Sequence, residues 1–261
     1  MRTVFRLAVT PVKALALLHP GSVRLEPFGV AENRRFYLID DIDKLASGSR
    51  HGRLVQIRAE YDPAEEWLRL AFPDGATAQG RADQVTGDRL VTDFYGRPVE
   101  GHAVIGPFSD AISDWYGQPL RLARTDRPGS ANDVHALSLM STASARALAT
   151  ATGSDRPLET RRFRMLLELD GCEPFEEDTW DGRLLRIGAD GDGALIRVGG
   201  QIPRCAVTTY DPERGERDFG TLKAIKDLRG VNTTGNLPFG VYGEVVEPGV
   251  VRVGDAVELA D

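Results

Sequence analysis

Apolar and polar positions alternate along the chain in short runs, and this pattern predicts many short β-strands and few helices. In the first half, the one expected helix covers residues 109–116, with Ser109 as its N-terminal cap and Gly117 at its end. The strands expected there cover residues 4–9, 35–39, 54–59, 67–72, 90–94 and 120–123. The first half is therefore predicted to be β-rich.

The second half repeats this pattern and adds two helices. An alanine-rich helix is expected to begin after Ser141 or Thr142 and to end at Gly153, and another covers residues 222–229 before Gly230. The expected strands cover residues 134–139, 163–169, 184–187, 194–198, 206–209, 240–246 and 250–257. Many short strands separated by turns are typical of barrel-like β architecture.

A loop rich in Pro, Gly, Ser and Asp covers residues 124–132 and separates the two halves. A chain of 261 residues is long enough for two ordinary domains. We therefore predict an N-terminal β-rich domain over residues 1–125 and a β-barrel domain over residues 126–261. The expected fold class is α+β and predominantly β.

Charge and composition narrow the range of possible functions. The formal net charge of −7 argues against a protein that coats nucleic acid. No run approaches the roughly 20 apolar residues that a membrane helix needs. The first apolar stretch, residues 4–18, is interrupted by Arg6, Pro11 and Lys13, unlike a signal peptide. Only two cysteines are present, too few for a disulfide framework. We expect a soluble cytoplasmic protein with no membrane or nucleic-acid partner.

Cys205 is the candidate for chemistry. It follows Arg204, and two hydroxyl residues, Thr208 and Thr209, come shortly after it. A thiol beside a guanidinium can be held as the nucleophilic thiolate. If residues 206–209 continue a strand that begins at Pro203, alternation points Arg204 away from Cys205. From the residues alone, a small buried cysteine remains the alternative.

The blocks around Cys205 resemble a known family, the MOSC domain, which is the C-terminal domain of molybdenum cofactor sulfurases. These blocks, in chain order, are Arg162-Phe163-Arg164, Gly171-Cys172-Glu173-Pro174, Arg204-Cys205, Thr208-Thr209, Asp211-Pro212, Phe239-Gly240-Val241-Tyr242, Pro248-Gly249 and Val253-Gly254-Asp255. The first half, with Pro11-Val12-Lys13 and Arg35-Phe36, resembles the β-rich domain that precedes MOSC in the amidoxime-reducing component and its bacterial relatives.

The resemblance implies a molybdenum cofactor in its molybdopterin form, with Cys205 bonded directly to the metal. Because this cofactor carries a phosphate, its pocket needs cationic donors. Lys13, Arg35 and Arg164 match basic residues of the relatives, and Arg204 and Thr208 are further candidates for cofactor binding. Three departures remove polar groups of the relatives: Ala14, Pro203 and the pair Met165-Leu166.

The resemblance implies a molybdenum-dependent oxidoreductase that reduces small N-hydroxylated compounds. A separate electron-transfer protein would supply the electrons, since the chain lacks the cysteines of an iron–sulfur cluster. A carrier of sulfur or of molybdenum cofactor, using a Cys205 persulfide or thiolate, is the alternative. A binding module without activity is a third possibility. Cys172 is either a second thiol near the site or a packed residue in a turn.

Overall fold

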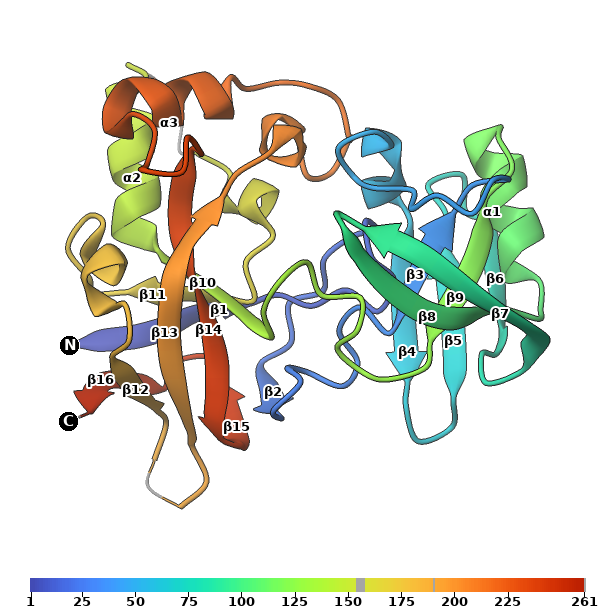
Figure 1. Cartoon of the computed structure of the whole chain (residues 1–261), viewed down its shortest axis with the longest axis horizontal. Helices are drawn as coiled ribbons and strands as arrows, with labels where there is room; N and C mark the ends of the chain where they lie inside the picture. The colour runs from blue at the N-terminus through green and yellow to red at the C-terminus, as the bar shows by residue number, and fades with distance from the viewer. Residues whose placement is uncertain (154–157, 190, 261) are drawn as a thin grey trace.

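A closed seven-stranded β-barrel forms one half of the protein, and a smaller unit built of two sheets forms the other (Figure 1). The computed structural model describes residues 1–153, 158–189 and 191–260. Strands dominate and helices are short, which confirms the predicted β-rich α+β class. In Figure 1 the barrel lies on the left and the two-sheet unit on the right.

The barrel closes because β1 pairs with both β11 and β16. Only β10 and β11 are parallel among its neighbouring strands in the described residues, with Leu139 opposite Leu167. Its strands, in order around the barrel, are β1 (Arg2–Leu7), β11 (Leu167–Asp170), β10 (Leu137–Ser141), β14 (Pro238–Glu247), β13 (Ala194–Pro203), β12 (Leu184–Ile187) and β16 (Ala256–Ala260). Alternate residues point inward and fill the barrel with Leu, Ile and Val.

The two-sheet unit packs a four-stranded sheet and a three-stranded sheet around its own apolar core, which includes Phe36, Leu70 and Phe108. The larger sheet contains, in order, β3 (Phe36–Ile39), β9 (Arg121–Thr125), β8 (Arg97–Val104) and β7 (Val85–Phe94). The smaller contains β4 (Arg58–Asp62), β5 (Trp67–Ala71) and β6 (Thr77–Arg81). The helix α1 (Phe108–Tyr116) covers this core, and Gly117 ends it with φ of 82° as predicted.

Two helices cover one end of the barrel, α2 (Thr142–Ala151) and α3 (Thr221–Arg229). Of the two predicted caps of the alanine-rich helix, Ser141 or Thr142, the structure has Ser141, whose Oγ accepts a hydrogen bond from Ser144 N at 3.0 Å. Leu148 and Ile225 of the two helices join an apolar cluster with Phe163 and Phe239. This cluster supports the ends of β13 and β14 beside which Cys205 lies.

Strand pairing crosses the predicted domain boundary. The first strand of the chain, β1, belongs to the barrel, and β2 (Ser22–Leu25) pairs with β15 (Gly249–Arg252). The chain then enters the two-sheet unit and returns through residues 126–136. The division of the chain at residue 125 stays a prediction. Two connections between the halves, residues 8–35 and 126–136, thus meet where the halves join.

Several predicted elements were wrong. The strand expected at residues 54–59 is the 3₁₀ turn η1 (Gly52–Gln56) followed by β4. The strand expected at 250–257 is divided between β15 and β16, since Gly254 has φ of 92° and breaks the extended backbone. Ser109 does not cap α1; its Oγ accepts from Leu122 N at 3.1 Å and so ties the helix to β9.

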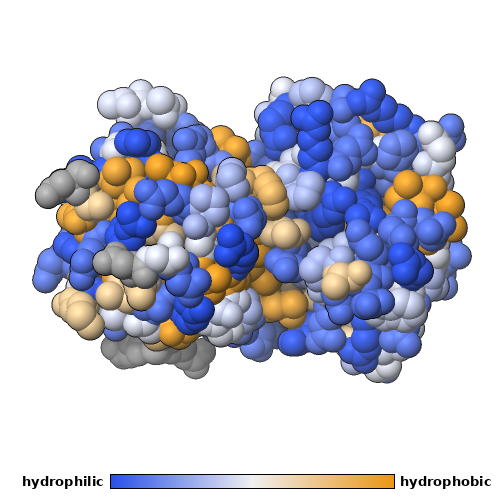
Figure 2. All heavy atoms as spheres, turned by 90° about the horizontal axis from the view of Figure 1, so that it is seen from below, coloured by the Kyte–Doolittle hydropathy of each residue, from blue (hydrophilic) through white to orange (hydrophobic). Residues whose placement is uncertain are grey.

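The described helices are too short and too polar to cross a membrane. Figure 2 views the molecule from below and shows two lobes with a waist between them. On this face the hydrophobic residues gather mainly over the left-hand lobe, which is the barrel, and the two-sheet lobe is largely hydrophilic.

Candidate functional site

Cys205 lies exposed on a short turn just after β13 ends at Pro203. The predicted strand at residues 206–209 was wrong: this segment is the 3₁₀ turn η4 (Ala206–Thr209), and Cys205 is its N-terminal cap with φ of −121° and ψ of −178°. The hydroxyl of Thr208 donates to the carbonyl of Cys205 at 3.0 Å, which favours a turn over a strand. The thiol is thus presented on a tight turn.

Thr208 stabilises this turn from its buried side. Its side chain is fully buried, and its carbonyl accepts hydrogen bonds from Arg162 Nη1 at 3.1 Å and Thr221 Oγ1 at 2.6 Å. The sequence assigned Thr208 to cofactor binding, but its contacts in the structure are with the backbone of the turn and with α3. We therefore describe it as a residue that positions Cys205.

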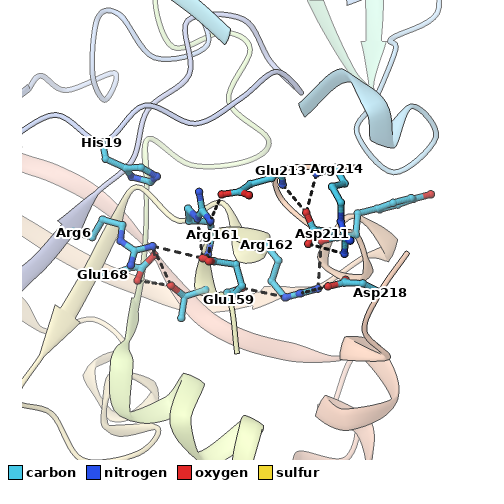
Figure 3. Close-up of polar contacts among 12 residues, drawn as sticks. Arg6, His19, Glu159, Arg161, Arg162, Glu168, Asp211, Glu213, Arg214 and Asp218 are labelled. Atoms are coloured by element: carbon cyan, nitrogen blue, oxygen red, sulfur yellow. Dashed lines mark hydrogen bonds and ion pairs between the residues drawn. The ribbon is translucent and has the colours of Figure 1, made fainter. Parts of the chain in front are cut away.

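Arg162 fixes the segment that follows the turn (Figure 3). Its guanidinium is almost completely buried and forms two hydrogen bonds to the carboxylate of Asp218, both at 3.0 Å. It also donates to the carbonyl of Tyr210 at 3.3 Å. Around it, Arg161 bonds Glu159 and Glu213, so the η2 turn (Thr160–Phe163) is tied to residues 208–218. A charge-paired network of this kind gives the Cys205 turn a rigid base.

A second group of charges lies on the interdomain connections. Asp133 accepts from Lys13 Nζ at 2.6 Å and from Arg34 Nη1 at 2.6 Å, so one carboxylate bridges two cations. Lys13 Nζ also donates to the carbonyl of Ala131 at 3.0 Å. Burial lowers the pKa of Lys13 to about 8, with Arg34 adding to the effect and Asp133 opposing it. Burial alone would raise the pKa of Asp133, but Lys13 and Arg34 outweigh it and hold that pKa well below its usual range.

Arg164 and Arg204 bring two more positive charges to this group. Arg164 Nη2 donates to the carbonyl of Leu15 at 2.7 Å. Arg204 donates to the carbonyl of Phe163, and its buried Nε has no hydrogen-bond partner among the residues that the structure describes. Burial lowers the pKa of each arginine to about 10, and the charge of Arg34 lowers both further.

These side chains form one cluster beside the thiol. The charges of Asp133 and Arg34 act on both Arg164 and Arg204, and the charge of Cys205 acts on Arg204. We call these four cations (Lys13, Arg34, Arg164 and Arg204) the cationic cluster; Asp133 pairs with Lys13 and Arg34, and its charge also acts on Arg164 and Arg204. A phosphate site requires an excess of positive charge and guanidinium N–H groups that can donate to phosphate oxygens.

Arg35, which the sequence assigned to the cofactor, lies outside the cluster. Its Nη1 donates to the carbonyl of Thr125 at 2.7 Å, and its charged neighbours are Arg124 and Glu66. The preceding residue, Arg34, belongs to the cluster instead of Arg35. Arg34 has a left-handed backbone with φ of 53°, so the alternation of an extended strand does not apply to this pair, and the two guanidinium groups lie in different surroundings.

The predicted strand at residues 163–169 was wrong at its start, and this changes how Arg164 is placed. β11 begins only at Leu167, and Arg164 has a left-handed backbone with φ of 55° at the end of η2. Arg164 is therefore a turn residue directed toward the interdomain connection and not a charge inside a strand. Ala14, one of the departures from the relatives, likewise has a positive φ of 76° next to Lys13.

Cys172 lies away from the cluster. Its Sγ is 4.0 Å from the carbonyl of Asp170 at the end of β11, and it packs against the barrel core. Burial, together with the charges of Glu176 and Glu177, raises the pKa of its thiol to about 12. The two cysteines are both free thiols. The structure brings Cys205 together with the cationic cluster and leaves Cys172 on another part of the barrel.

No group of three or more His, Cys, Asp or Glu side chains is arranged to hold a metal ion within the described part of the chain. Any metal at this site would therefore need ligands from another source besides Cys205. A thiolate is the softest ligand that a protein side chain supplies and suits a soft, redox-active metal. The arrangement is an exposed thiol next to a cluster of cationic side chains.

Comparison with known families accounts for nearly the whole chain. The MOSC domain matches residues 126–258, and the MOSC N-terminal beta barrel domain matches residues 1–121. The chain is 24% identical to mitochondrial amidoxime-reducing component 1 of Xenopus laevis over 288 residues, covering 97% of this chain and 81% of that protein.

Two other relatives match over smaller shares of their own length. Mitochondrial amidoxime reducing component 2 of Rattus norvegicus is 36% identical over 114 residues, which cover 41% of this chain and 32% of that protein. Molybdenum cofactor sulfurase of Caenorhabditis briggsae is 26% identical over 268 residues, covering 98% of this chain and 36% of that protein. The chain therefore spans about a third of each of these two relatives.

Proposed function

Because the chain belongs to the MOSC domain family, we propose that it binds molybdenum cofactor at the cationic cluster, with Cys205 as the metal's protein ligand. We further propose that it reduces small N-hydroxylated compounds with electrons from a separate redox protein. The names of the relatives, amidoxime-reducing component and molybdenum cofactor sulfurase, support an association with this cofactor.

The residues at the site suit such a cofactor. The observation that carries the proposal is the cationic cluster beside an exposed thiol, with the Nε of Arg204 buried and lacking a partner among the described residues. A buried donor without an acceptor costs free energy unless a ligand satisfies it. A phosphate group brings several acceptor oxygens and the negative charge that the cluster lacks.

Each residue would then have a defined task. Lys13, Arg34, Arg164 and Arg204 would hold the phosphate end, and Cys205 would bind the metal as thiolate. When bound, the cofactor supplies two-electron redox chemistry at molybdenum. Thr208 and Arg162 keep the Cys205 turn in place through their bonds to its backbone. The protein would thus contribute binding and orientation.

The proposed reduction is balanced in atoms and in electrons. A hydroxylamine R–NH–OH gains two electrons and two protons, its N–O bond breaks, and an amine and a water are released. The electrons come from a reduced redox protein, and the protons come from water. An exposed position for Cys205 leaves room for a small substrate to approach.

Steady-state kinetics test the proposal. Protein made in a host that synthesises molybdenum cofactor should reduce a hydroxylamine or amidoxime repeatedly with reduced viologen as the electron donor. Many turnovers per Cys205 are the expected result. No turnover by protein that contains molybdenum would contradict the reductase.

The exposure of Cys205 also favours a second candidate, a carrier of sulfur or of the cofactor. A carrier needs one reactive, accessible thiol and acts stoichiometrically. In that case the Cys205 thiolate should take the outer sulfur atom of a donor protein's persulfide, with the donor leaving as a thiol, and should pass this sulfur to a thiol of an acceptor protein in the same way. Mass spectrometry of the Cys205 peptide before and after transfer separates this candidate from the reductase.

The pKa of Lys13 predicts how anion binding depends on pH. With a pKa of about 8, Lys13 is charged below pH 8 and loses its charge above it. Sulfate, which does not titrate in this range, should therefore bind more weakly as the pH rises through 8, by up to about tenfold per unit for one linked proton. The charged groups facing Lys13 are Asp133, whose pKa is held well below this range, Arg34, and Arg164, whose pKa of about 10 lies above it. Titration calorimetry from pH 7 to 9 measures the effect.

The Lys13→Met variant is the control for this pH dependence. It should bind sulfate more weakly at pH 7 and show no further loss up to pH 9, below the pKa of about 10 of Arg164 and Arg204. The stability of the fold should depend on pH in the opposite direction to sulfate affinity. The folded-state pKa lies below the ordinary value of 10.5, so the wild type should gain stability as the pH rises from about 8 toward 10.5. A wild-type affinity that is flat over this range would contradict the assignment of Lys13.

A further inference from the structure

Tyr95 stands at the tip of the β7–β8 hairpin in an unusual conformation. It has φ of 58°, and Gly96 after it has φ of 90°. Tyr95 and Gly96 form the two-residue loop between the paired residues Phe94 and Arg97, and such a tight hairpin loop needs positive φ at both positions, although a bulky residue is uncommon at the first of them. Yet 66% of Tyr95 is exposed, which makes it the most exposed aromatic residue in the described chain. Packing of its own ring into a core therefore does not explain its conformation.

The hairpin itself is firmly anchored. Phe94, just before Tyr95, is buried against Tyr37 at a ring distance of 5.2 Å and lies 5.3 Å from Lys13 Nζ. Arg97, just after the turn, donates to the carbonyls of Ser130 at 2.9 Å and Asn132 at 2.6 Å. Figure 1 shows the hairpin reaching from the two-sheet unit toward the barrel. Tyr95 is thereby fixed next to Asp133 and the cationic cluster.

The loop at residues 47–49 connects Tyr95 to the Cys205 turn. The hydroxyl of Ser47 neighbours the phenol of Tyr95. The next residue, Gly48, is so close to Val207 of the turn that an added Cβ would lie 3.2 Å from its side chain. Tyr210, at the end of the turn, donates to the carbonyl of Ser49 at 3.1 Å. One short loop thus contacts both Tyr95 and the segment that carries the thiol.

Tyr95 also shares the electrostatic surroundings of the thiol. Although most of the residue is exposed, burial of its phenol raises its pKa to about 12, and the charges of Asp133 and Cys205 contribute. The phenol therefore shares the electrostatic surroundings of the cluster and the thiol, and the loop at residues 47–49 packs against the turn that carries the thiol. An aromatic ring held in the open at this place has no evident structural task.

We propose that Tyr95 is a specificity-determining residue, an aromatic wall beside Cys205 that favours substrates carrying an aromatic ring. The proposal rests on the proposed function, since it concerns which N-hydroxylated compounds reach the site. Offset or edge-to-face contact between two rings contributes about 0.5–1.5 kcal/mol beyond area burial. A flexible side chain would lose this advantage, and the strained, anchored hairpin keeps the ring in place.

Two variants separate the ring from the hydroxyl. Tyr95→Ala should raise the KM for an aromatic amidoxime such as benzamidoxime roughly fivefold, with kcat and the KM for hydroxylamine unchanged. Tyr95→Phe keeps the ring and should retain the wild-type preference. Trp67→Ala, which removes another exposed aromatic residue on β5, is the matched control and should change neither KM. Equal KM ratios in wild type and Tyr95→Ala would overturn the proposal.

A second measurement needs no cofactor and no turnover. In a Cys172→Ser background, Cys205 is the one remaining cysteine, and its alkylation by iodoacetamide and by a bulky pyrene maleimide can be compared. If Tyr95 lines the approach, Tyr95→Ala should change the ratio of the two rates at least threefold, and Tyr95→Phe should not. An unchanged ratio in a variant that melts like the wild type would place Tyr95 away from the thiol. A different outcome separates the two proposals. If molybdenum-containing protein shows no turnover but Tyr95→Ala still changes the ratio of the two alkylation rates, the proposed reductase is contradicted and Tyr95 still lies beside Cys205.

Discussion

Replacing Cys205 by serine should remove molybdenum from the protein and abolish turnover while the fold survives. Serine is nearly isosteric, and the side chain is exposed, so packing changes little. The hydroxyl is a much harder ligand than thiolate and is not ionised at neutral pH, so it is a poor ligand for a soft metal. Metal analysis after gel filtration and circular dichroism measure the two effects.

Cys172→Ser is the matched control, because it removes the other cysteine without touching the cluster. Cys172 lies at the end of β11, and burial keeps its thiol protonated, with the pKa raised to about 12. This variant should therefore retain both molybdenum and turnover, at a small cost in stability. Equal metal content and equal rates in wild type and Cys205→Ser would rule out Cys205 as the ligand.

The parts of the fold that the sequence predicted well depend on local signals. The Ser141 cap and the Gly117 end of α1 are set by the residues next to them, and both are confirmed. The strand at residues 184–187 has the predicted bounds, since its alternation directs every second residue into the barrel. The barrel's closure by β1 joins the start of the chain to strands more than 160 residues away, and no local pattern indicates that partner.

The errors at the site also have physical reasons. Residues 207–209 have β-branched side chains that favour a strand, but the hydroxyls of Thr208 and Thr209 bond back to carbonyls three residues earlier. Arg34 was missed because its left-handed backbone, with φ of 53°, is not visible as a pattern in the sequence. The residues next to Tyr95 in the sequence do not indicate a functional site. Tyr95 comes near the Cys205 turn only when the β7–β8 hairpin of one half packs against the other half.

The junction of the two halves therefore carries the candidate site. Lys13 and Arg34 come from the first connection, Asp133 from the second, and Arg164 and Arg204 from the barrel side. The four cations of the cluster thus come from both sides of the junction. The contacts between the η1 region and the segment after Cys205, such as Gln56 to the carbonyl of Arg214 at 2.6 Å, keep the halves in register. Anion binding should consequently be sensitive to single charges in the cluster.

Arg164→Met should separate binding from stability. Arg164 is desolvated and repelled by Arg34, as its pKa of about 10 indicates, and it lacks a carboxylate of its own among its hydrogen bonds. Replacing a desolvated charge by an apolar side chain of similar size is often neutral or stabilising. The lost hydrogen bond to Leu15 offsets part of that gain. The melting temperature of the cofactor-free protein should therefore stay within a few degrees of the wild type.

The same substitution should weaken sulfate binding about 10- to 100-fold, since a hydrogen bond from a charged donor contributes about 1.5–3 kcal/mol. Arg35→Met is the matched control with the opposite pattern. It removes the bonds that hold β3 to Thr125, so stability should fall, but sulfate affinity should hold because Arg35 lies outside the cluster. Calorimetric titration and thermal melts of both variants decide the question. If Arg35→Met loses sulfate and Arg164→Met does not, the phosphate site lies on the other face of β3, and the cluster at the junction serves only to join the two halves.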